Sequence, residues 1–138
     1  IKLYAFMKIS EPHQLNCAEI AQKLGIKLHY GCFSLRYANY IVIKKSTKQK
    51  EWQDFGHEVC HFLQHEGNQL EMHSLFFDFQ EWQANCFAYH FCVPTFMLEK
   101  VKEKSVYNIM DLFNVEYQFA FKRLEMYERK MIHARAYR

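Results

Sequence analysis

Residues 49–66 constrain the fold more than any other segment, because their apolar side chains would all lie on one face of a helix. Trp52 and Val59 belong to an apolar stripe that repeats at helical spacing over residues 49–66. At about 100° per residue, His57 and His61 fall roughly opposite that stripe. The segment therefore predicts a helix that buries one face and leaves two imidazoles on the other, available for chemistry.

The rest of the chain also favours helices. Only four Gly and two Pro occur among 138 residues, too few for a many-turned sandwich or barrel. Thirteen Phe and nine Tyr exclude a disordered chain and can supply a core. This length suits one domain. We therefore expect a single domain over residues 1–138, with residues 105–138 as a helical C-terminal extension that resembles a helix-turn-helix.

The coarse order of elements follows from periodicity and breakers. We predict helices over residues 12–24, 49–66, 78–93, 95–102, 106–113 and 115–131, strands over 26–30 and 37–44, and a loop or short strand over 69–79. The predicted fold class is α+β. It is mostly helical, with a small antiparallel or mixed sheet packed on the 49–66 helix and on a second helix that supplies a metal ligand.

The histidine face carries the pattern HExxH, in the residues His57-Glu58-Val59-Cys60-His61. Residues four apart lie one turn above each other, so both imidazoles can reach one ion. Glu58 projects beside them, where it can contact a water molecule on the metal without binding the metal itself. This arrangement predicts a metal site with Glu58 as the catalytic base. Cys60 is interpreted as a small packing residue.

A catalytic zinc takes three protein ligands, so one more is needed. The extended pattern HExxHxxGxxH is excluded, because Gln64 and Gly67 stand where it needs Gly and His. His65 lies eight residues after His57, about 12 Å along the helix axis, which is too far to share the ion. We therefore interpret His65 as a supporting or surface residue rather than a ligand.

Glu81 is the better third ligand, because it lies on the next long helix, far enough along the chain for that helix to return antiparallel. Its face also carries Asn85, which we expect to hold the far nitrogen of a liganding histidine. Ala88 and Cys92 on that face are small and would allow the two helices to approach closely. The remainder of the helix is apolar nearly all round, which predicts burial.

Charge, cysteine content and hydropathy indicate the cellular compartment and the kinds of partner to expect. The net charge of +3 does not by itself imply nucleic acid, although the C-terminal stretch is basic. Five cysteines, an odd number without a CxxC pair, indicate free thiols in a reducing compartment. No apolar run reaches the roughly 18 residues of a membrane span, and the first nine residues make a poor signal peptide. These features predict a cytoplasmic location and no membrane partner.

The central block resembles a known family. HEVCHFLQH followed by EWQANCFAYHFCVP is similar to the ImmA/IrrE family of metallo-endopeptidases, whose members show HExxH, a further His four residues on, and an E-x-x-A-N-x-F-A segment that ends in Pro. Weaker similarity extends over nearly the whole chain. Glu116 departs from the pattern, which usually has serine after the valine at that place.

The resemblance implies a zinc peptidase with a gluzincin-like core, whose protein substrate is a helix-turn-helix repressor of a prophage, mobile element or stress operon. The oxyanion of the reaction needs further donors. The main candidates are Tyr30, Tyr37, Tyr40 and His73, with Tyr89 and the less favourably placed His90 as further possibilities. Two alternatives stay open: a catalytically silent zinc-binding module that sequesters a repressor, and a DNA-binding helix-turn-helix protein. The sequence disfavours direct nucleic-acid contact, because aromatic residues crowd the start of the last helix, and it leaves the oligomeric state open.

Overall fold

The computed structural model describes residues 2–64 and 73–136 of the chain. Its helices are α1 (Lys2–Met7), the short 3-10 turn η1 (Pro12–Gln14), α2 (Cys17–Leu24), α3 (Lys48–Gln64), α4 (Ser74–Cys92), α5 (Thr95–Leu98), α6 (Val106–Phe113) and α7 (Tyr117–Ala136). Its strands are β1 (Lys27–Gly31), β2 (Leu35–Tyr37) and β3 (Tyr40–Lys44). The predicted fold class, a mostly helical α+β fold with a small mixed sheet, is confirmed.

The sheet has the strand order β1-β3-β2, with β1 parallel and β2 antiparallel to the central strand β3. The sequence predicts a single strand over residues 37–44, but the chain turns back within it. Ala38 adopts a φ of 51°, a left-handed conformation that the alternating apolar pattern does not signal. Ile41 and Ile43 are fully buried and join the sheet to the core.

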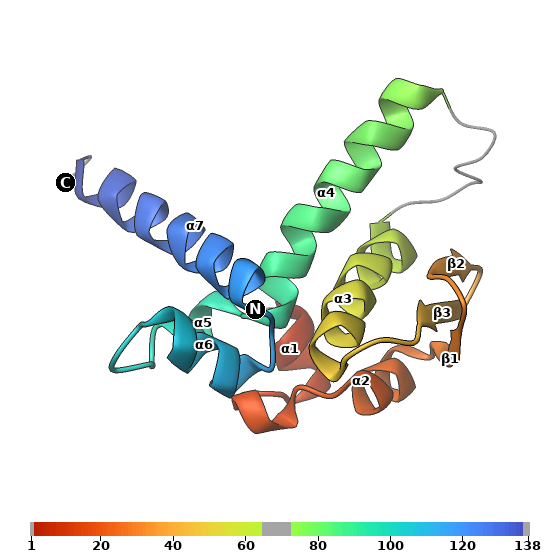
Figure 1. Cartoon of the computed structure of the whole chain (residues 1–138), viewed down its shortest axis with the longest axis horizontal. Coiled ribbons are helices and arrows are strands. Elements are labelled where there is room, and N and C mark those ends of the chain that lie inside the picture. The colour runs from red at the N-terminus through yellow and green to blue at the C-terminus, as the bar shows by residue number, and fades with distance from the viewer. Residues whose placement is uncertain (1, 65–72, 137–138) are drawn as a thin grey trace.

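Helix α3 lies between the sheet and α4, so it is the central element of the molecule (Figure 1). Its crossing with α4 is tight at Gly56, where a Cβ atom would lie 2.9 Å from the Cys92 sulfur and 3.4 Å from the Ala88 Cα. The close approach predicted from Ala88 and Cys92 is therefore present. It depends equally on Gly56, which the sequence analysis did not single out.

Helix α4 begins earlier than predicted. It starts at Ser74 instead of near residue 78, and the His73 imidazole caps it by accepting a hydrogen bond from the Leu75 backbone N–H. The prediction that α4 is buried all round is wrong for its first half. Trp82 is 62% exposed and stacks on Phe79, which is itself exposed.

The C-terminal helices are joined to the rest through buried contacts. Arg123 on α7 is 1% exposed, and it donates hydrogen bonds to the Val93 carbonyl and the Thr95 hydroxyl at the end of α4. It is therefore a core residue rather than part of the expected basic surface patch. Helix α7 runs from Tyr117 to Ala136, later at both ends than predicted, and α5 ends at Leu98.

Helix α1 has no counterpart among the predicted elements. Its residues Tyr4 and Met7 are buried, and the Tyr4 hydroxyl donates to the Phe91 carbonyl near the end of α4. No helix in the described part of the chain combines the length and the apolar character needed to cross a bilayer.

Candidate metal centre

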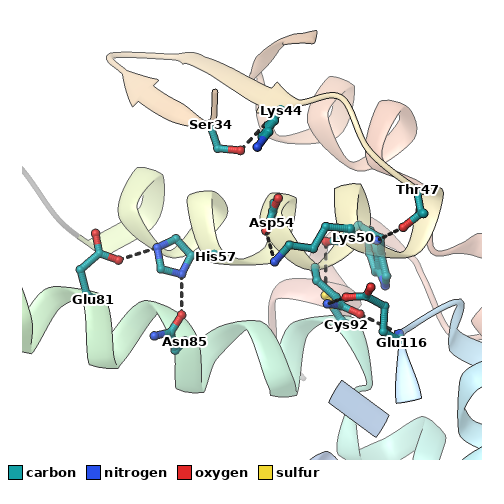
Figure 2. A network of polar contacts seen from close by, with 12 residues as sticks. Ser34, Lys44, Thr47, Lys50, Asp54, His57, Glu81, Asn85, Cys92 and Glu116 are labelled. Atoms are coloured by element: carbon teal, nitrogen blue, oxygen red, sulfur yellow. Dashed lines mark hydrogen bonds and ion pairs between the residues drawn. The ribbon is translucent and has the colours of Figure 1, made fainter. Parts of the chain in front are cut away.

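Three side chains from two helices converge on one point. His57 and His61 extend from α3, and Glu81 extends from α4. Figure 2 shows the Glu81 carboxylate pointing toward the His57 ring. The Glu81 Oε2 atom lies 2.6 Å from the His57 Nε2 atom and 3.6 Å from the His61 Nε2 atom. The two Nε2 atoms are 3.2 Å apart. The antiparallel return of the second helix thus brings the three predicted ligands together.

These separations fit the dimensions of a tetrahedral zinc site. Ligand atoms at about 2.0–2.1 Å from a common zinc are separated from one another by about 3.3 Å. The three observed distances lie around that value. Two histidines and a carboxylate also form a typical ligand set for catalytic zinc, with a fourth position left for water or substrate. The residues present can therefore hold a metal ion.

Asn85 determines which nitrogen of His57 faces this point. The His57 Nδ1 atom lies 2.9 Å from the Asn85 Oδ1 atom, one helical turn from Glu81 (Figure 2). An amide oxygen can only accept a hydrogen bond, so His57 donates from Nδ1 and keeps the lone pair of Nε2 for a ligand. This is the contact that we expected from the helical spacing of Glu81 and Asn85.

Glu58 lies next to the three converging groups in a much less polar environment. Glu58 as a whole residue is only 9% exposed, whereas the side chain of Glu81 is 30% exposed. The pKa of Glu58 is raised to about 7, chiefly by burial and to a smaller extent by the nearby Glu81 and Asp54, against the lowering effect of His57 and Arg36. A carboxyl group with its pKa near neutral pH can both accept and release a proton, as general acid–base catalysis requires.

A groove of about 940 Å³ opens along α3 and includes His57 and Glu58 in its lining. One wall comes from the β1–β2 loop and the end of β3, through Ser34 and Lys44 among others. The other wall comes from α4 and from the start of α7, through residues that include Tyr89 and Glu116. The candidate metal centre therefore lies beside a groove that is bounded by the sheet on one side and by α4 and α7 on the other.

The four main oxyanion candidates occupy other places, and none belongs to the lining of this groove. Tyr30 lies on β1 near Cys17, and burial raises its pKa. Tyr37 and Tyr40 are exposed residues that pair across the β2–β3 hairpin. His73 caps α4 eight residues before Glu81, about 12 Å away along the helix axis. His65, the supporting residue predicted beyond His61, lies outside the described residues.

Most residues that line the groove were not predicted from the sequence. Gln53 and Asp54 could have been found, since they precede His57 by four and three residues and so share its helix face. Lys44 and Lys122 could not, because only the tertiary structure brings β3 and α7 to either side of α3. No periodic pattern along the chain signals such a meeting.

Known proteins are similar in sequence to the region that forms this centre. The model of the IrrE N-terminal-like domain, a peptidase family, matches residues 19–125. The phage-like element PBSX protein XkdA of Bacillus subtilis (strain 168) is 40% identical over 139 residues, covering 93% of this chain and 70% of that protein. The uncharacterized protein YqaB of the same organism is 36% identical over 140 residues, covering 94% and 81%.

No solved structure gave a significant match. The family model spans the candidate metal centre, the groove and the first part of α7, and the two relatives extend the similarity over nearly the whole sequence. The chain therefore belongs to the IrrE N-terminal-like, or ImmA/IrrE, family of metallopeptidases.

Proposed function

We propose that this protein is a zinc-dependent endopeptidase that cleaves a helix-turn-helix repressor and so relieves repression, in a phage-like or other mobile element. The observation that carries the proposal is the convergence of His57, His61 and Glu81 beside the buried Glu58. The name of one relative, a phage-like element protein, supports the proposal that this protein acts in a mobile element. The repressor as substrate rests on the family resemblance.

The proposed mechanism assigns a task to each residue. His57, His61 and Glu81 would hold zinc, which when bound supplies a Lewis acid that polarises the scissile carbonyl and acidifies water. Glu58 accepts the proton of the attacking water and returns it to the leaving amine, as its pKa near 7 permits. Asn85 keeps the His57 ring in its ligand orientation.

The variant Glu58→Gln tests this assignment. It keeps the shape of the side chain and removes its basicity, so we expect bound zinc to be retained and cleavage of a co-expressed repressor to fall by a factor of at least about 100. Zinc content is measured on protein purified without chelator, and fragments are identified by mass spectrometry. Undiminished cleavage by this variant would refute Glu58 as the base.

The same experiment distinguishes an active peptidase from a catalytically silent module that only sequesters the repressor. In that case the wild-type protein would form a stable complex with an intact repressor, and Glu58→Gln would change nothing. The buried position of Glu58 next to the ligands favours a catalytic function. Burying a carboxyl group lowers the stability of the fold, and a sequestering module would gain nothing from it.

Two features of α7 disfavour the other alternative, DNA recognition by the C-terminal helices. The Phe119 ring stacks on Tyr89 of α4 at 4.5 Å, and Arg123 is buried against the end of α4. Residues near the start of a recognition helix need to be free to contact bases. Here they attach α7 to the peptidase core instead.

A further inference from the structure

The groove beside the metal centre has a definite length and direction. Its floor is one face of α3, from Lys50 to Glu58. Eight residues of helix span about 12 Å, and an extended peptide covers that length with about four residues. A substrate whose scissile bond lies at the metal centre therefore places a short stretch, on one side of that bond, along this floor.

Several charged side chains that line the groove already contact other groove residues. The Lys50 ammonium lies 3.1 Å from the Asp54 carboxylate, one turn along the same helix. The Glu116 carboxylate accepts a hydrogen bond of 2.9 Å from the Gln53 amide, and the Glu116 backbone N–H donates to the Gln53 oxygen at 2.7 Å. Glu58 belongs to the reaction centre.

Two exposed lysines remain, one on each wall. Lys44 ends β3 on the sheet side, beside Ser34, and Lys122 lies on the first turns of α7. Lys122 does contact Glu125 at 3.3 Å, but that carboxylate is shared with Arg129 at 2.7 Å, so the cluster keeps a positive charge. A chain lying on the floor would pass between these two ammonium groups.

We propose that the groove binds an extended segment of the substrate on one side of the scissile bond, and that Lys44 and Lys122 select acidic side chains in it. This inference rests on the proposed peptidase function and specifies its substrate class. A peptide suits the groove better than a nucleic acid does. Separate carboxylates can meet the lysines individually, whereas a continuous phosphate backbone would also pass the Glu116 carboxylate, whose negative charge the Gln53 amide does not neutralise.

The test uses the zinc-loaded Glu58→Gln protein, so that binding is measured without cleavage. Two dye-labelled peptides share one alanine-rich background and differ only in carrying glutamates or lysines. We expect the glutamate peptide to bind roughly three- to tenfold more tightly by fluorescence anisotropy, and we expect added salt to reduce that difference. Competition by a single-stranded oligonucleotide as strong as that by the glutamate peptide would overturn the choice of a peptide.

The lysines themselves are tested by reversing their charge. Introducing Lys44→Glu and Lys122→Glu together should reverse the preference, whereas Lys130→Glu, an exposed lysine farther along α7, should leave it unchanged. Retained zinc content and an unchanged circular dichroism spectrum verify that the variants fold. Equal binding of the two peptides, binding of neither, or an unchanged preference in the double variant would refute the proposal. Cleavage is assayed separately with wild-type protein, so failure of the peptidase function remains a distinct outcome.

Discussion

At the scale of single residues, the contact between Asn85 and His57 shows how one amide can control a metal ligand. The amide oxygen selects the protonated nitrogen of the imidazole and so orients the other nitrogen toward Glu81. Without that contact the ring could rotate or change tautomer. The amide therefore contributes to metal affinity without touching the metal.

Replacing Asn85 by Ala should therefore weaken zinc binding by about 10- to 100-fold, the usual effect of removing such a supporting hydrogen bond. Competition with a fluorescent chelator measures the affinity. The matched control is Asn108→Ala, which removes an amide on α6 that hydrogen-bonds the Glu103 carbonyl, away from the metal centre. Equal zinc affinity in wild type and Asn85→Ala would show that the contact does not support the ligand.

Arg123 illustrates a different use of a polar side chain. Burial lowers its pKa to about 10, yet the guanidinium stays charged at neutral pH and binds the Val93 carbonyl. Val93 is the C-cap of α4, where carbonyl groups lack helical partners. Composition suggests a basic surface at this point in the sequence, because nothing in a charge count distinguishes a buried arginine from an exposed one.

Arg123→Ala should lower the free energy of unfolding by about 3 kcal/mol, since it leaves the Val93 carbonyl unpaired and opens a cavity. Arg129→Ala, on the same helix, should cost less than about 1 kcal/mol, because Arg129 is 72% exposed in its ion pair with Glu125. Urea denaturation of both variants measures the difference. Similar losses for the two variants would contradict a core role for Arg123.

At the scale of elements, the crossing of α3 and α4 sets the metal geometry. Gly56 immediately precedes His57 and lies against Ala88 and Cys92, so the helices meet backbone to backbone next to the ligands. Any side chain at this position would push α4 outward and carry Glu81 with it. The distance between ligands on different helices is therefore fixed by three small residues.

Gly56→Ala should lower the free energy of unfolding by about 1–3 kcal/mol through overpacking, and it should weaken zinc binding as well. Combining it with Cys92→Ala removes the nearest atom, 2.9 Å from the added methyl group. The double variant should therefore lose less stability than the sum of the two single variants, a coupling that a double-mutant cycle measures. Strict additivity would show that the contact is not close.

The long helices and the metal triad were predictable because each rests on a period within one helix. His57 and His61 are one turn apart on α3, and Glu81 and Asn85 repeat that spacing on α4. The β2–β3 turn and α1 were not predictable. The first depends on a left-handed Ala38, and the second on tertiary burial of Tyr4, neither of which leaves a periodic signal.

At the scale of the whole molecule, a metal ion at this centre would couple binding to stability, because its ligands come from two separate helices. A ligand at 100 times its dissociation constant stabilises a folded protein by about 2.7 kcal/mol. For a chain of this size that corresponds to an increase of roughly 9 °C in the melting temperature. The metal would thus act partly as a cross-link between α3 and α4.

We expect the melting temperature to rise on addition of zinc and to fall on treatment with a chelator, as followed by circular dichroism. Glu81→Ala removes the ligand that α4 contributes, and it should abolish most of the shift. Asp111→Ala, a carboxylate that is exposed on α6, serves as the control and should keep the shift. An equal zinc effect in Glu81→Ala would place the metal elsewhere.

The reciprocal hydrogen bonds between Gln53 and Glu116 have a consequence for how this protein can be recombined. Gln53 belongs to α3, which bears the histidines, and Glu116 immediately precedes α7, which forms part of one wall of the groove. A chimera that exchanges the C-terminal helices between relatives would preserve the recognition surface only if it inherits both residues from the same parent. The α3 helix and the segment leading into α7 therefore need to be exchanged together.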